Sequence, residues 1–288
     1  MTAATLPSKR TASLRMTPGR RVLLAIGVPV ILAVILWDGF SLIASFGTAT
    51  FAVSGTVPVV NGQVTAFYGG ANATVNEGAA GGSTAQLTGR VQYSLIKPRF
   101  SQESATGGTR LHLACAIPFG TCQLTSDLAV PAGTAVNLSS QGGDMQVSGV
   151  TAEATLNSAG GNVTMSGGGS KTTVSTGGGD LTASSLGGTL NFTSGGGDVT
   201  GNGLTAPATT ISSGGGDVTV VYTKVPDHLA IVSSGGDVTV LLPPGSTRYA
   251  VSETASGGDS AVSVPAGGSS HIISVNSGGG DITIAQSS

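Results

Sequence analysis

The side chains with the clearest chemical potential are carboxylates that recur behind paired glycines. Gly-Gly-Asp, once Gly-Gly-Asn, occurs eight times at steps of 18 to 22 residues. Carboxylates at a short fixed period bind Ca²⁺ in secreted β-rolls, but those repeats are nine residues long. One carboxylate per 18 to 22 residues supplies few ligands for an ion that takes six to eight oxygens. We therefore expect no metal and no cofactor, with calcium as the alternative, and predict that these side chains cap the glycine turns. The predicted turn-capping residues are Asp144, Asn162, Asp180, Asp198, Asp217, Asp237, Asp259 and Asp281.

Two short strands must position each of these residues. The residues one and three past the Asp are apolar in seven of the eight repeats, and the residue between them is Thr in six. This alternation indicates a strand with one buried face. The residues six and eight before the Asp are also mostly apolar, so a second strand precedes each turn. Clear departures from this pattern are Gly201, Glu253 and Ser260.

Such a unit cannot bury its apolar face alone and must stack on its neighbours. We predict an all-β fold, a single-stranded β-helix or β-solenoid of about eight rungs of 18–22 residues over residues 129–288. Glycine should supply positive φ at the corners. Residues 47–128 form an irregular β segment, either degenerate rungs or a cap. The strand at 282–285 comes last, so we expect it at an uncovered edge.

The N-terminus predicts a membrane anchor. Residues 1–21 contain five basic side chains and no acid, and residues 22–46 are mostly apolar, with Asp38 as the one charged residue. Positive charge stays inside, so we predict one transmembrane signal anchor over 22–46, a cytoplasmic tail over 1–21 and an extracellular C-terminal domain. The run from Val22 to Trp37 would place Asp38 near the outer headgroups. A cleaved signal peptide is the alternative, with Ala44, Ala49 and Ala52 at suitable distances for processing.

The charge of the chain argues against one class of partner, and its cysteines predict a disulfide. Beyond residue 47 the chain has seven basic and thirteen acidic residues, a net charge of −6, which argues against nucleic acid. Cys115 and Cys122 are the only cysteines and would lie on the oxidising side of the membrane. We expect a local disulfide between them rather than a metal pair with His112.

No motif predicts catalysis. Residues 167–172, GGGSKT, imitate a phosphate loop, but Ser170 replaces the required glycine, and no helix is expected to follow. The three histidines are isolated, and no serine lies in G-x-S-x-G. We expect no enzyme and no catalytic residue. The outward threonines could offer hydroxyls to a glycan, although Thr also suits any solvated strand.

Several stretches resemble one known family. They are VPAGTAVNLSSQGGDMQVSG, the recurring TSGGGDVT and SSGGGDVTV, the VPD and PPG turns at 225 and 243, and the final SGGGDITI. Over residues 50–288 the chain resembles a bacterial family of β-strand repeat proteins named putative adhesins, domain of unknown function 4097. The resemblance implies a solenoid at the cell surface and carries over no catalytic residue. We expect a surface-binding module with a glycan or protein partner; the alternative is a sensor of envelope stress.

Overall fold

A computed structural model describes Val30 and residues 48–78, 82–105, 108–114, 121–268 and 270–287. Apart from Val30, the predicted tail of residues 1–21 and the predicted anchor of residues 22–46 lie outside this part of the chain. Across the described ranges, no helix has the length and apolar character that crossing a membrane requires.

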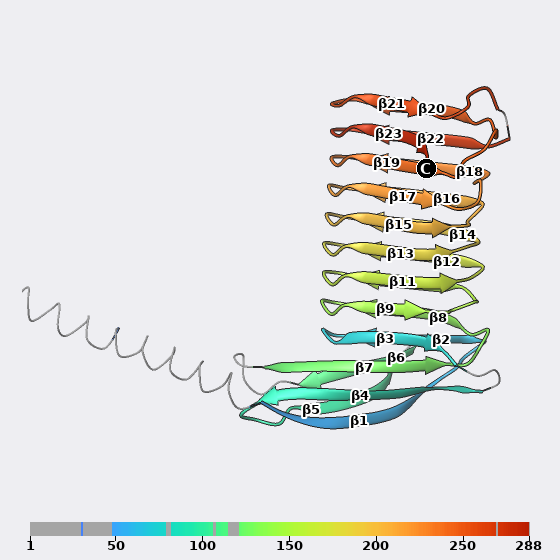
Figure 1. Cartoon of the computed structure of the whole chain (residues 1–288). Coiled ribbons are helices and arrows are strands. Elements are labelled where there is room, and N and C mark those ends of the chain that lie inside the picture. Colours follow the sequence, from blue (N-terminus) through green and yellow to red (C-terminus); the bar gives the residue numbers. More distant parts are fainter. Residues whose placement is uncertain are drawn as a thin grey trace, which may run out of the picture.

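The described chain is all-β, with strands in one sheet of 12 and one of 11 (Figure 1). Most strands form rungs, each made of one strand from each sheet and a glycine corner between them, which is Gly-Gly-Asp in most rungs. The rungs, in chain order, are β2 (Gln63–Tyr68) with β3 (Asn72–Glu77), β8 (Ala135–Ser140) with β9 (Met145–Ser148), β10 (Ala154–Ser158) with β11 (Val163–Gly168), β12 (Lys171–Thr176) with β13 (Leu181–Leu186), β14 (Thr189–Ser194) with β15 (Val199–Leu204), β16 (Ala208–Ser213) with β17 (Val218–Tyr222), β18 (His228–Ser233) with β19 (Val238–Leu242), β20 (Ala250–Ala255) with β21 (Ser260–Ser263), and β22 (Ile272–Ser277) with β23 (Ile282–Gln286).

The rungs stack in parallel and in register, so that equivalent residues lie above one another. Val163 pairs with Leu181, and Leu181 pairs with Val199. The inward residues of both strands are buried; Leu156 and Val174 are examples with no more than 1% of their surface exposed. The stacked apolar columns of the sequence therefore form one continuous core between the two sheets, as predicted.

The stack begins with one rung inside residues 47–128, the segment for which we expected degenerate rungs or a cap. Tyr68 pairs with Ser140 and Ala73 with Met145, which places the segment YGGAN at 68–72 in register with the first predicted corner. This rung lacks the repeat signature because Tyr68 stands where most other rungs have Ser or Thr, and Ala71 with Asn72 replaces Gly-Asp.

The last two rungs are stacked out of chain order. The rung β22–β23 lies between β18–β19 and β20–β21, so Ile273 pairs with both Leu229 and Val251. Figure 1 shows β20 and β21 beyond β22 and β23 at the end of the stack. The expectation that the final strand forms the uncovered edge is therefore wrong. Chain order would bury Glu253 and Ser260, which are exposed in the outermost rung.

Antiparallel strands close the other end of the stack. β1 (Thr48–Pro58), β4 (Thr84–Ser94) and β7 (Cys122–Val130) extend one sheet, and β5 (Arg99–Ala105) and β6 (Gly108–Ala114) extend the other. Gln102 on β5 donates from Nε2 to the carbonyl oxygen of Thr56 on β1, at 2.5 Å. This bond joins the two sheets beneath the first rung. We call these five strands the cap.

Candidate functional site

The Gly-Gly-Asp side chains form one hydrogen-bonded ladder along the stack. In each step, Oδ1 of one residue accepts the backbone N–H of the equivalent residue in the next rung. Asp198 N donates to Asp180 Oδ1 at 3.0 Å, and Asp217 N donates to Asp198 Oδ1 at 2.9 Å. The bonds thus link neighbouring rungs rather than capping the residue's own turn. In spatial order the ladder runs Asn72, Asp144, Asn162, Asp180, Asp198, Asp217, Asp237, Asp281, Asp259.

In most rungs a buried Ser or Thr holds the corner from within, a role that the repeat pattern alone did not reveal. It lies four residues before the Asp; Ser194 Oγ, for example, donates to the carbonyl oxygen of Gly197 at 2.6 Å. Six residues do this for their own corner: Ser140, Ser158, Thr176, Ser194, Ser213 and Ser233. The outermost rung has Ala255 at this position. The recurrence of Ser or Thr four residues before the Asp was the available signal.

The glycine before each Asp is required by close approach and not by backbone conformation. None of these glycines has a positive φ. A Cβ on Gly179 would instead lie 2.3 Å from the carbonyl oxygen of Gly161 in the rung below. Positive φ occurs near the end of the following strand, at Gly167, Ser185 and Gly203, or directly after it, at Gly149. The expected role of the corner glycines is thereby corrected.

The remaining candidate ligands and reactive groups are dispersed. In the described ranges, no three His, Cys, Asp or Glu side chains lie together as metal ligands would. His271 Nδ1 is 3.0 Å from the carbonyl oxygen of Pro226, whereas His112 and His228 belong to β6 and β18. Cys122 begins β7, and Cys115 lies outside the described residues, so their disulfide stays a prediction.

Three tyrosines direct their hydroxyls into the interior. The hydroxyls of Tyr68, Tyr222 and Tyr249 are buried without a hydrogen-bond partner among the described protein atoms. Burial raises the pKa of Tyr68 to about 12, with a smaller opposing effect of the Ser126 hydroxyl, and burial also raises the pKa of Tyr222. These phenols stay protonated near neutral pH and are shielded from any substrate.

Outward threonines of one sheet form a straight row across the rungs. Strand register places Thr164, Thr182, Thr200, Thr219, Thr239 and Thr283 side by side, which we call the hydroxyl row. Neighbouring strands lie about 4.8 Å apart, so the row presents one hydroxyl at each such step. Towards the cap it continues through Gln146 and Thr74 to Asp127 and Thr88.

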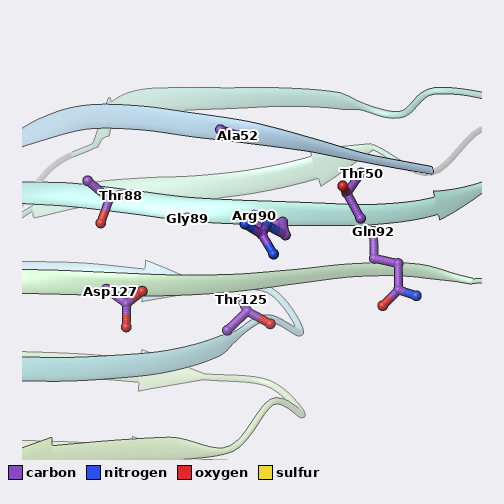
Figure 2. A pocket seen from close by; sticks show the side chains of 8 residues that line it. All are labelled: Thr50, Ala52, Thr88, Gly89, Arg90, Gln92, Thr125 and Asp127. Carbon is purple, nitrogen blue, oxygen red and sulfur yellow. The ribbon is translucent and has the colours of Figure 1, made fainter. Parts of the chain in front are cut away.

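An open groove lies where this row reaches the cap. It has a volume of about 590 Å³ and is lined by Thr50, Ala52, Thr88, Gly89, Arg90, Gln92, Thr125 and Asp127. Figure 2 shows these residues on three adjacent strands, β1, β4 and β7. We call this the Arg90 groove. It combines a guanidinium, a carboxylate, an amide and hydroxyls on a solvent-facing sheet, which suits hydrogen bonding to a polyhydroxyl or carboxylate ligand.

Arg90 also connects the groove to the carboxylate ladder. Arg90 pairs with Thr125, and Thr125 pairs with Asn72, the first residue of the ladder. These residues lie far apart in the sequence and no motif links them, so only strand register could have revealed the groove. Its described lining contains no histidine or cysteine.

The ladder leads to a prediction at Asp198. Asp198→Ala should destabilise the fold by about 1 kcal/mol, because the Asp217 amide loses its acceptor. Asp198→Asn keeps that acceptor and removes repulsion between carboxylates about one rung apart, so its stability should equal or exceed that of the parent at low salt. Urea unfolding at low and high salt measures both variants. An Asn variant as unstable as the Ala variant would contradict the ladder.

A second prediction concerns Glu77, which connects the first rung to two loops. Its carboxylate accepts the Gly133 amide at 2.5 Å and the Thr151 amide at 2.7 Å, and also accepts the Thr151 hydroxyl. Partial burial raises the pKa of Glu77, but the hydrogen bonds together outweigh this and lower it below its usual range.

Because the folded-state pKa of Glu77 is depressed, its stabilising effect is present above the unfolded-state pKa, about 4.3. The effect is lost as pH falls through the folded-state value. Because solvent screens this largely exposed carboxylate, Glu77→Gln should cost less than about 1 kcal/mol at neutral pH and progressively less in acid. Urea midpoints of both proteins across this pH range test the prediction, and a pH-independent difference would refute it.

The chain was compared with known proteins in three ways. None of the curated proteins compared with the chain is a match. A putative adhesin from Bacteroides fragilis shares 17% identity, with 82% of this chain and 97% of that chain covered and a TM-score of 0.47. A putative cell adhesion protein from Clostridium sporogenes shares 13%, with 83% and 100% covered and a TM-score of 0.26. A putative lipid binding protein from Parabacteroides distasonis shares 10%, with 84% and 97% covered and a TM-score of 0.40. The family model described as Toastrack DUF4097 matches residues 113–288, more than half of the chain, and the chain therefore belongs to this family.

Proposed function

We propose that this chain is a membrane-anchored extracellular binding module without catalytic activity, and that its partner is a cell-surface glycan or protein. The observation that carries the proposal is the hydroxyl row that ends in the Arg90 groove. A rigid sheet presents regularly spaced hydroxyls and leads to one guanidinium and one carboxylate. This arrangement favours a polar, extended ligand.

The polarity of the groove favours a glycan over an apolar ligand. Arg90 and Gln92 supply N–H donors, Asp127 supplies acceptors, and the threonine hydroxyls supply both. Vicinal sugar hydroxyls, or a sugar carboxylate on Arg90, would match these groups. The predicted anchor of residues 22–46 would hold this surface outside the cell, with residues 1–21 in the cytoplasm.

Glycan-array binding by the full chain in nanodiscs tests the proposal. Arg90→Ala should weaken binding at least about tenfold, the loss of one charge-assisted hydrogen-bonding group. Lys171→Ala is the matched control, because Lys171 is an exposed cation on the other sheet, paired with Glu153. If both variants retain full binding, the Arg90 groove is not the binding site. Hydrolysis of any glycan on the array would refute the non-enzymatic role.

A sensor of envelope stress is the second candidate, favoured by the five basic residues of the tail. In that role the tail or the membrane helix would relay ligand binding to a cytoplasmic or membrane partner. Deleting residues 1–21 while preserving export separates the two roles. Surface binding should persist in the deletion variant if the chain is an adhesin, whereas a stress response should disappear if it is a sensor.

A further inference from the structure

The connection between β4 and β5 exposes two large aliphatic side chains beside two cations. Leu95 is 46% exposed and Ile96 is 50% exposed. Lys97 and Arg99, which follow, are exposed as well, and Pro98 between them is buried. We call residues 95–99 the cap tip. Its composition, aliphatic at the end and basic behind, is that of an interfacial membrane contact.

The backbone of the cap tip is held in a conformation that its sequence does not favour. Leu95 has φ of 63°, in the left-handed region that a non-glycine residue rarely adopts. The preceding residue is fixed, because Ser94 N donates to the Thr121 carbonyl oxygen and Ser94 Oγ accepts the Thr121 amide at 2.7 Å. The Ile96 amide donates to the Ser94 carbonyl oxygen at 2.7 Å and closes a tight turn around Leu95, and this turn presents the aliphatic side chain to solvent.

The tip also has a rigid base. The Lys97 ammonium lies 4.5 Å from the centre of the Phe51 ring, and that ring meets Tyr93 edge to face. Phe51 belongs to β1, so the tip is attached to the first strand of the described domain. A rigid loop loses little conformational freedom when it meets a surface.

The position of the tip identifies that surface. Ser94 pairs with Thr48, the first residue of β1, so the tip lies beside the point where the chain arrives from residues 22–46. Ten residues separate Asp38 from Thr48, which limits their separation to about 35 Å. Residues 39–46 are mostly apolar, which favours a distance between Asp38 and Thr48 that is shorter than this limit.

Charge distinguishes this region from the rest of the extracellular domain. Residues 84–102 contain Arg90, Lys97 and Arg99 and no acidic residue, although the chain beyond residue 47 carries a net charge of −6. A local excess of cations beside exposed aliphatic groups complements anionic lipid headgroups over an acyl layer.

We propose that the cap tip docks on the outer leaflet, with Leu95 and Ile96 entering the interface and Lys97 and Arg99 contacting lipid phosphates. The proposal rests on the membrane anchor of the proposed function. Docking would give the domain a second membrane attachment and hold the cap, with its Arg90 groove, close to the bilayer.

Tryptophan fluorescence of the full chain in vesicles tests the docking. Trp37, the only tryptophan, is replaced by Phe, and Ile96→Trp is introduced as the reporter. The control is Val262→Trp, an exposed aliphatic position in the outermost rung at the opposite end of the stack. In vesicles of phosphatidylcholine and phosphatidylglycerol with brominated acyl chains, quenching of the Ile96→Trp reporter should be at least about twice that of the control.

Charge variants then test whether Lys97 and Arg99 contact the lipid phosphates. Lys97→Gln with Arg99→Gln should reduce Ile96→Trp quenching on the anionic vesicles to the value on pure phosphatidylcholine. An alkaline wash of the vesicles tests the anchor separately. If the chain stays bound to the vesicles through this wash but Ile96→Trp is quenched no more than the control, docking is refuted and the anchor stands. If the chain washes off, the anchor fails and the docking proposal falls with it.

Discussion

Gly179→Ala should destabilise the solenoid by about 3 kcal/mol or more, whereas Gly178→Ala, one residue earlier in the same corner, should change its stability by less than about 1 kcal/mol. A Cβ on Gly179 would lie 2.3 Å from the Gly161 carbonyl oxygen and 2.5 Å from its carbonyl carbon, whereas a Cβ on Gly178 would meet nothing within 4 Å. The clashing atoms belong to the backbone, so no side-chain rotation relieves the contact.

The clash cannot be relieved locally because each corner is bonded to the next. The Asp180 amide donates to Asn162 Oδ1, and the Leu181 amide donates to the Asp198 carbonyl oxygen. Moving this corner outward would break both the side-chain ladder and the backbone hydrogen bonds to the neighbouring rungs. Urea midpoints of the two variants and the parent measure the difference. Equal stability of the two variants would show that the corner glycines serve only to make the chain flexible.

Ile284→Asp should cost more than about 4 kcal/mol, and Val262→Asp should cost less than about 1 kcal/mol. The two residues occupy equivalent positions and pair with each other across β23 and β21. Ile284 has no exposed surface, because Val240 lies on its other side, whereas Val262 is 40% exposed in the outermost rung. A carboxylate at position 284 would be buried without a partner.

Hydrogen exchange identifies which rungs this substitution affects. Ile284→Asp should remove protection from β20 through β23 together, since β20–β21 is attached to the stack only through β22–β23. Val262→Asp should leave the protection of β22 and β23 intact. The reverse order of effects would mean that the rungs stack in chain order. Thermal melts of both variants give the accompanying loss of stability.

The repeat pattern was sufficient to predict the stack and its core. Apolar residues at fixed offsets from each Asp required two strands with one buried face, and neither strand could be buried without neighbouring rungs. The pattern was insufficient to predict the order of the last two rungs, because parallel strands with equivalent sequences pair equally well with either neighbour. Glu253 and Ser260 carried the signal, since polar residues at inward positions belong at the end of a stack.

The roles of the corner residues followed from the sequence only in part. The recurrence of Gly and Asp marked a constrained turn, but it did not show that Gly179 avoids a backbone carbonyl or that Asp198 bonds the rung above. Both contacts join residues about one repeat apart and exist only after stacking. The exact position of the first rung within residues 47–128 could not be predicted for a related reason: Tyr68 and Asn72 fit the stack by position while departing from the repeat by residue type.

The sequence by itself therefore determined a repeating β architecture, its buried columns and its family, because the alternation and the period of apolar residues can be read from each segment alone. Tertiary structure alone decided which rungs meet, why the corners require glycine, and where Arg90, Thr125 and Asp127 form one groove. The reason is that a groove on a sheet depends on the register between strands. Register is set by hydrogen bonds and packing across the stack, which no single segment encodes.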